Sequence, residues 1–182
     1  MKKSIGIVLV ALTISLFGCS SEKAPEQAQQ IPNITLSQSE KDALVTYYKD
    51  VLSIESLAGK AIKVAEDEVV NVIKGGEGSI TLTSIIDKAK NESIRTVESL
   101  AKANVPDMLP PEAKSLLSET KNDLAASYKA HAESFESINT FIAEKSPMAL
   151  LEYRKKSAQA QELFTKATDK LNQIMKAAGV PQ

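Results

Sequence analysis

Residues 37–74 are SQSEKDALVTYYKDVLSIESLAGKAIKVAEDEVVNVIK, a pattern typical of one long amphipathic helix. Ser37 and Glu40 have the spacing of a capping box, in which the serine hydroxyl accepts the Glu40 backbone N–H and the Glu40 carboxylate reaches back. Gly75-Gly76-Glu77-Gly78-Ser79 then ends the pattern. The apolar stripe of this helix recurs every three or four residues, and we assign to it Leu44, Tyr48, Val51, Ala58, Ile62, Ala65, Val69 and Val72, widened by Tyr47, Ile54 and Ala61.

Three further helical patterns follow, each with a recognisable start or stop. The second is expected over residues 80–104, ahead of Pro106, because a proline disfavours helical backbone in the residue before it. The third, over 111–144, starts at Pro111, and proline is well placed as a first helical residue. The fourth opens at Ser146-Pro147 and ends at Gly179 and Pro181, and we assign Leu151 to its apolar stripe.

This succession predicts an all-α fold over residues 37–182, an up-down-up-down antiparallel four-helix bundle. Counted as Lys and Arg minus Asp and Glu, residues 40–74, 80–104, 111–145 and 146–178 carry −2, +1, −2 and +3. Neighbours in a simple ring therefore have opposite charge, which favours this topology. The effect on stability is small, because an exposed ion pair contributes only about 0.2–1 kcal/mol.

The amino-terminal residues have the features of a cleaved leader. Lys2 and Lys3 precede an apolar run over residues 4–17, which suits a signal peptide and is shorter than the roughly 20 residues that a membrane-spanning helix needs. Without Lys2 and Lys3 the net charge falls from −1 to −3, and no basic block remains. We therefore expect no nucleic-acid partner.

The leader ends in Leu16-Phe17-Gly18-Cys19, which contains the only cysteine of the chain and resembles the lipobox of bacterial lipoproteins. The resemblance implies that residues 1–18 are removed and that Cys19 carries a diacylglyceryl thioether, in some members with a palmitate-like N-acyl chain. It also implies attachment to the cell membrane or outer membrane on its extracytoplasmic side. Phe17 is bulkier than the usual residue there. The alternative is an ordinary secretory signal followed by an unpaired cysteine.

The organisation predicted from these features has three parts: the signal peptide (1–18), a lipidated cysteine with a flexible linker (19–36) and the bundle (37–182). The linker prediction rests on its polar, proline-containing sequence, which has neither helical nor strand periodicity.

The middle of the bundle holds the candidate ligand-binding residues. His131, the only histidine, lies at heptad spacing from Leu124 and Ile138, and we expect a neutral, partly buried ring hydrogen-bonded to a hydroxyl or carbonyl. Dense packing of bulky side chains against small ones is the favoured interpretation, and an apolar pocket for a lipid tail or small hydrophobic ligand is the other. The residues concerned are Tyr128, His131, Phe135 and Phe164, which face Ala58, Ala61 and Ala65.

Other site chemistry lacks the necessary residues. One histidine without a Glu-x-x-His pair does not make a di-iron site, and zinc would need further His or Cys ligands, so we expect neither metal nor cofactor. The glycine-rich segment 75–79 lacks the Gly-Lys-Ser/Thr ending of a phosphate-binding loop. We therefore expect a non-catalytic, lipid-anchored protein that presents helical surfaces to an envelope protein partner, or alternatively a module that binds a small hydrophobic or lipid-like ligand.

Overall fold

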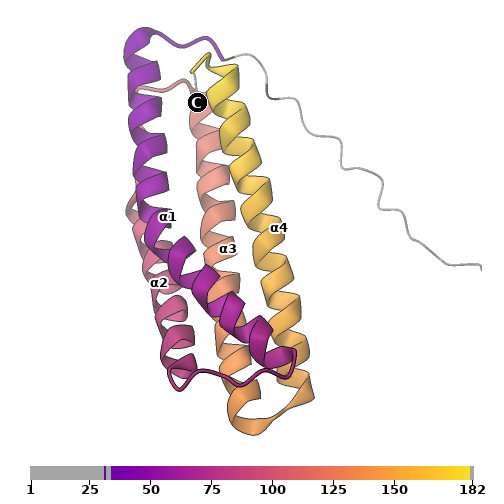
Figure 1. The fold of residues 1–182 in the computed structure, drawn as a ribbon. Helices are drawn as coiled ribbons and strands as arrows, with labels where there is room; N and C mark the ends of the chain where they lie inside the picture. The colour runs from indigo at the N-terminus through magenta and orange to yellow at the C-terminus, as the bar shows by residue number, and fades with distance from the viewer. Residues whose placement is uncertain (1–30, 32–33, 181–182) are drawn as a thin grey trace, which may run out of the picture. The chain divides into compact units, whose positions relative to one another are not determined.

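The computed structural model describes residue 31 and residues 34–180, which form four α-helices and no strand. The all-α prediction is therefore confirmed for this part of the chain. The helices are α1 (Gln38–Ile73), α2 (Leu82–Lys102), α3 (Pro111–Glu144) and α4 (Pro147–Ala177), and Figure 1 shows them side by side. None of these helices combines the length and the apolar character that crossing a membrane requires.

Local sequence sets where the helices begin. The Ser37 hydroxyl accepts the Glu40 N–H at 3.4 Å, and the Glu40 carboxylate accepts the Ser37 N–H at 2.7 Å, so the predicted capping box is present. At the start of α4, the Ser146 hydroxyl accepts the Ala149 N–H at 3.5 Å. Pro111 occupies the first turn of α3, where a missing N–H leaves no hydrogen bond unmade.

α3 and α4 run in opposite directions and are joined by three ion pairs. The pairs join Lys156 to Glu133 at 2.6 Å, Lys166 to Asp123 at 3.4 Å and Lys170 to Glu119 at 2.5 Å. Because the residue number rises on α4 as it falls on α3, these contacts define an antiparallel register. Small side chains let the two backbones approach closely, and the Ser127 hydroxyl donates to the Ala160 carbonyl at 2.9 Å.

α2 and α3 also run in opposite directions and are joined by side-chain contacts. Lys90 pairs with Glu136 at 3.2 Å, and the Asn139 amide donates to the Asp87 carboxylate at 2.8 Å. Close backbone contact therefore links α2 to α3 and α3 to α4, and it also links α1 to α2. The backbones of α1 and α4 approach each other less closely than those pairs.

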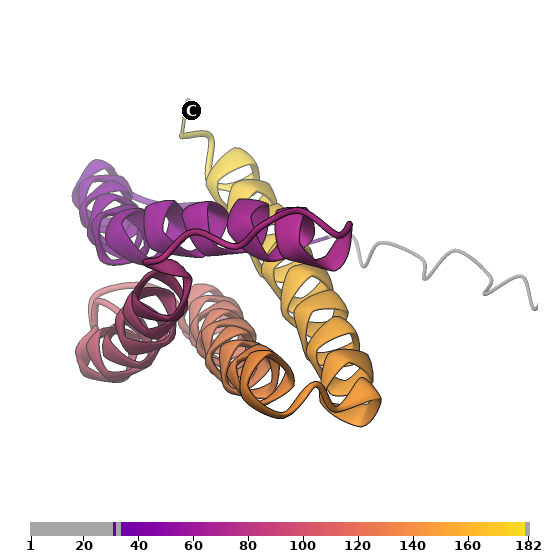
Figure 2. The ribbon, with the colours of Figure 1, turned by 60° about the horizontal axis from the view of Figure 1, so that its bottom comes forward.

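α1 does not keep one direction along its length. In Figure 1 its amino-terminal half runs alongside the other helices, whereas the half that ends at the 74–81 connection slants across them. In Figure 2 the same segment runs across the direction of α4 and passes it between its two ends. Large side chains of α3 and α4 occupy the interior beneath this half of α1.

All four helices contribute to one core. Phe135, Leu124 and Ile138 of α3 are almost completely buried, as the third helical pattern predicts. Two stripe positions differ from the prediction: Tyr47 is more deeply buried than Tyr48, and Leu151, which helical spacing suggested for the core, is 59% exposed. Where two apolar residues are adjacent, as at 47–48 and 150–151, the spacing does not say which of them faces the core. The packing of the helices decides it.

The packed domain begins before residue 37. Ile34 and Leu36, which the sequence analysis placed at the end of the linker, are buried and belong to the core cluster. The physical reason is that these two apolar side chains alternate with polar ones, so an extended segment can direct both to the same side. The predicted signal peptide, the predicted lipidation site Cys19 and Pro181 lie outside the described residues.

Candidate functional site

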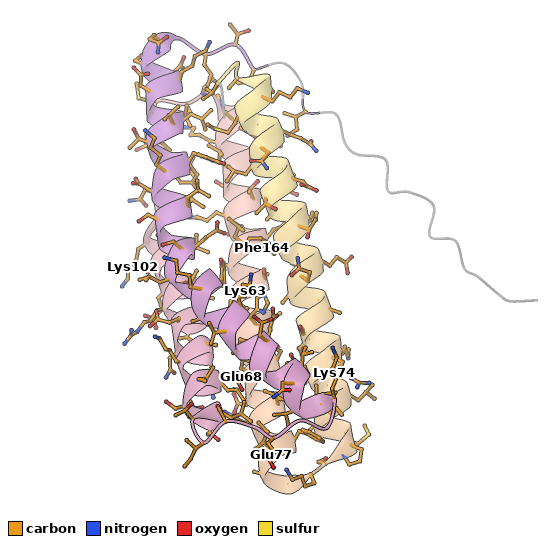
Figure 3. All side chains as sticks on the ribbon, viewed as in Figure 1. Lys63, Glu68, Lys74, Glu77, Lys102 and Phe164 are labelled. Carbon is orange, nitrogen blue, oxygen red and sulfur yellow. The ribbon has the colours of Figure 1, made fainter. Side chains whose placement is uncertain are left out.

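Four side chains from α3 and α4 form an aromatic row in the interior. The ring of Phe164 meets Tyr128 edge to face, with centroids 6.3 Å apart, and Tyr128 lies 6.3 Å from His131. His131 in turn stacks on Phe135 at 6.3 Å. The structure therefore brings together all four residues proposed from the sequence, and Figure 3 labels Phe164 about midway along the helices.

The side of α1 that faces the interior carries small residues and two acids. Ala58 and Ala65 are completely buried and Ala61 is partly buried in the same core cluster. Glu55 is 8% exposed and Glu66 is partly buried. This half of α1 therefore differs from the half that carries Leu44, Tyr47 and Val51, because its interior side has alanine and glutamate where the other half has large apolar side chains.

Glu55 is a buried carboxylic acid whose Oε1 atom has no hydrogen-bond partner. Burial raises its pKa from 4.5 to about 7, because the charged form loses its solvation. Burial also raises the pKa of Tyr128, and the Glu55 carboxylate raises it further. The two side chains are therefore close enough to interact electrostatically across the α1–α3 interface.

His131 and Glu66 form a second acid–base pair in the interior. The distance from His131 Nδ1 to Glu66 Oε1 is 3.9 Å, which is too long for a hydrogen bond, and the buried Nδ1 has no other partner. Burial lowers the pKa of His131 to about 4, so the ring is neutral at pH 7. The expected hydrogen bond to a hydroxyl or carbonyl is absent at Nδ1.

Tyr153 connects this pair to α4. Its ring is buried, and burial raises its pKa to about 12, with a further contribution from the Glu66 carboxylate. The pKa of Glu66 is itself raised by burial and by the neighbouring Asp67. The site thus consists of acids from α1, rings from α3 and rings from α4.

Sequence reasoning missed both glutamates. Glu55 lies four residues after Val51 and three before Ala58, so it occupies a position of the apolar stripe. We assigned Ile54 to that part of the helix because only apolar residues were counted. A charged residue at a stripe position is the signal that would have identified Glu55.

The basic side chains of α4 do not compensate these acids. Lys156, Lys166 and Lys170 each pair with an acid on the outer flank of α3. Arg154 and Lys155, the two basic residues directly before Lys156, are exposed. Within residues 34–180, no group of three or more His, Cys, Asp or Glu side chains is placed to hold a metal ion.

The glycine-rich segment has a structural explanation. The backbone N–H of Gly75 donates to Val72 and that of Gly76 donates to Asn71, both at 3.0 Å, so these two amides are engaged in ending α1. Gly75 has a φ of +86°, which a residue with a side chain rarely adopts, and a Cβ on Gly76 would collide with the Asn71 side chain. These contacts fit an interhelical turn.

Comparison with known proteins adds no further assignment: no protein-family model matches this chain, and no curated protein or solved structure matches it.

Proposed function

We propose that this protein is a non-catalytic binding module that takes a small ligand with an apolar part between α1, α3 and α4. The observation that carries the proposal is the pair of unpartnered polar atoms, Glu55 Oε1 and His131 Nδ1, on side chains that are more than nine-tenths buried. Buried polar atoms in folded proteins are almost always hydrogen-bonded. Four such unpartnered atoms occur in the described residues, the other two being Asp123 Oδ2 and Asn139 Oδ1. Because Glu55 Oε1 and His131 Nδ1 belong to side chains at the aromatic row, they favour a site that a ligand completes over a core that serves cohesion alone.

The proposed architecture is the up-down-up-down antiparallel four-helix bundle. It is supported by the antiparallel ion-pair register of α3 with α4 and by the Lys90–Glu136 contact between α2 and α3. The backbones of α1 and α4 approach each other less closely than those of the neighbouring pairs. A ligand would therefore enter between α1 and α4, because these two helices can move apart with the least loss of packing.

We further propose that the module is tethered to a membrane outside the cytoplasm through Cys19. The lipobox-like sequence supports this, and two or more acyl chains would give stable attachment where one chain gives only marginal binding. Cys19→Ala should abolish incorporation of labelled fatty acid and release or misprocess the protein. Unchanged labelling and unchanged membrane fractionation would contradict the tether and leave the binding proposal intact.

Native mass spectrometry of the full-length protein tests the binding role. We expect the purified protein to carry, or to take up from a panel of small amphiphiles, one ligand per chain. Phe164→Ala should weaken that binding because it removes the α4 ring that meets Tyr128. Leu163→Ala, a partly buried neighbour outside the aromatic row, is the matched control and should bind as the wild type does. No bound species and no thermal shift with any member of the panel would refute the proposal.

A second candidate function is presentation of a helical surface to an envelope protein. It is favoured by Leu57 and Val64, which lie seven residues apart on one face of α1 and are 66% and 52% exposed. Crosslinking in intact cells through a photoreactive residue at position 57 should then capture one partner. Capture should fail when the photoreactive residue is moved to position 63, which is also exposed but lies about 120° round α1 from position 57.

A further inference from the structure

We propose that the ligand of this site carries a protonated amine and that the Glu55 carboxylate is its ionic partner. This inference rests on the proposed binding function and specifies the chemical class of the ligand. Among the titratable groups of the site, only the acids can carry a charge at pH 7.

The two ionisable acids of the interior, Glu55 and Glu66, both come from α1 and have no basic partner of their own. The base that approaches Glu66 is His131, which is neutral at pH 7 because its pKa is about 4. The α4 lysines at 156, 166 and 170 are paired with α3 acids. A fatty-acid carboxylate would therefore meet like charge in a desolvated site, whereas an ammonium group would meet its counter-charge.

The aromatic row suits the same ligand. Ammonium groups are attracted to the faces of aromatic rings, and this attraction strengthens when the site excludes water. Tyr128 interacts electrostatically with Glu55 and meets Phe164 at 6.3 Å, so an anionic group and two aromatic rings adjoin one region of the interior. An apolar chain attached to the amine would lie against the alanine surface of α1, which includes Ala58 and Ala61.

Ionisation of Glu55 should be coupled to binding. The pKa of Glu55 is about 7 without ligand, so amine affinity should rise between pH 6 and 8. The other titratable groups of the site are Tyr128, which interacts with Glu55, and the cluster of Glu66, His131 and Tyr153. The rings do not titrate in this range, because burial lowers the pKa of His131 to about 4, raises that of Tyr153 to about 12 and also raises that of Tyr128. The Glu66→Gln variant removes the other acid of the site, so a pH dependence of affinity that persists in this variant is due to Glu55.

The test uses three probes with one chain length, n-octylammonium, 1-octanol and octanoate, titrated calorimetrically into the full-length protein at pH 8. We expect octylammonium to bind at least about tenfold more tightly than either other probe, as expected for a hydrogen bond to a charged group. Glu55→Gln should remove this preference and leave octanol binding unchanged. Glu68→Gln, an acid farther along α1 (Figure 3), should change nothing.

The outcomes separate the two proposals. Equal affinity for the three probes, or full amine preference in a folded Glu55→Gln variant, would overturn the amine assignment and leave a binding module. Failure of all three probes to bind would overturn the amine assignment, and the proposed function would then fall if the broader native mass-spectrometric panel also gave no bound species. Circular dichroism of each variant establishes that it is folded, and glutamine in place of glutamate preserves the side-chain shape.

Discussion

His131 Nδ1 lies 3.9 Å from Glu66 Oε1, and this buried nitrogen makes no hydrogen bond. The pair crosses from α3 to α1, and the neutral histidine does not balance the glutamate charge. A protein core normally satisfies such groups, so their presence beside Glu55 and the aromatic row is the feature that most distinguishes this interior from simple packing.

Glu55→Gln should stabilise the protein at alkaline pH. The folded-state pKa is raised from 4.5 to about 7, so the unfolded chain releases its proton first and stability falls as pH rises from 4.5 through 7. The full loss is about 3 kcal/mol, since one pKa unit corresponds to about 1.4 kcal/mol. Urea unfolding at pH 4 and pH 8 should show a gain in the variant at pH 8 and little difference at pH 4. A variant less stable than wild type at pH 8 would contradict this.

His131→Gln should remove a pH dependence of opposite sign. The histidine pKa is lowered from 6.5 to about 4 on folding, so its contribution is fully present above pH 6.5 and is lost as pH falls through 4. In the wild type, the His131 and Glu55 slopes nearly cancel between pH 4.5 and 6.5. The His131→Gln variant should therefore lose stability across that window as pH rises. A flat profile in this variant would show that Glu55 titrates normally.

Leu124→Ala should destabilise the protein by about 2–5 kcal/mol, because the side chain is only 1% exposed and its removal leaves a cavity. Leu151→Ala is the matched control: this leucine is 59% exposed and its truncation should cost less than about 0.5 kcal/mol. Equal losses at the two positions in chemical denaturation would mean that α3 or α4 is rotated about its axis.

Gly59→Ala should stabilise the protein by about 0.5–1 kcal/mol. Gly59 lies within α1, and a Cβ at this position meets no atom within 4 Å, so the alanine gains helix propensity without a collision. Thermal unfolding should show a higher midpoint. A lower midpoint would indicate that the change of direction along α1 depends on the glycine.

The sequence predicted what local interactions determine and missed what packing determines. Ser37, Ser146 and Pro111 were assigned correctly because capping depends on residues within one turn. Leu151 was placed in the core wrongly because an apolar residue at helical spacing says nothing about the final rotation of α4. The early start of the packed domain at Ile34 depends on contacts with distant residues.

The candidate site divides in the same way. The aromatic row was found because Tyr128, His131 and Phe135 share one face of a helix, and such faces are visible in sequence spacing. Glu55 was missed because only apolar residues were counted on the stripe of α1, although its spacing from Val51 and Ala58 places it there. Its unpartnered state is visible only once the surrounding side chains are placed.

The most direct test of the ligand-binding account follows the ring resonance of His131 by NMR during a titration with octylammonium. The chain contains one histidine, so this resonance needs no assignment among others. The account predicts a saturable shift in the wild type and a weakened response in Glu55→Gln. A His131 resonance that stays fixed through the titration, and through the broader amphiphile panel, would contradict it.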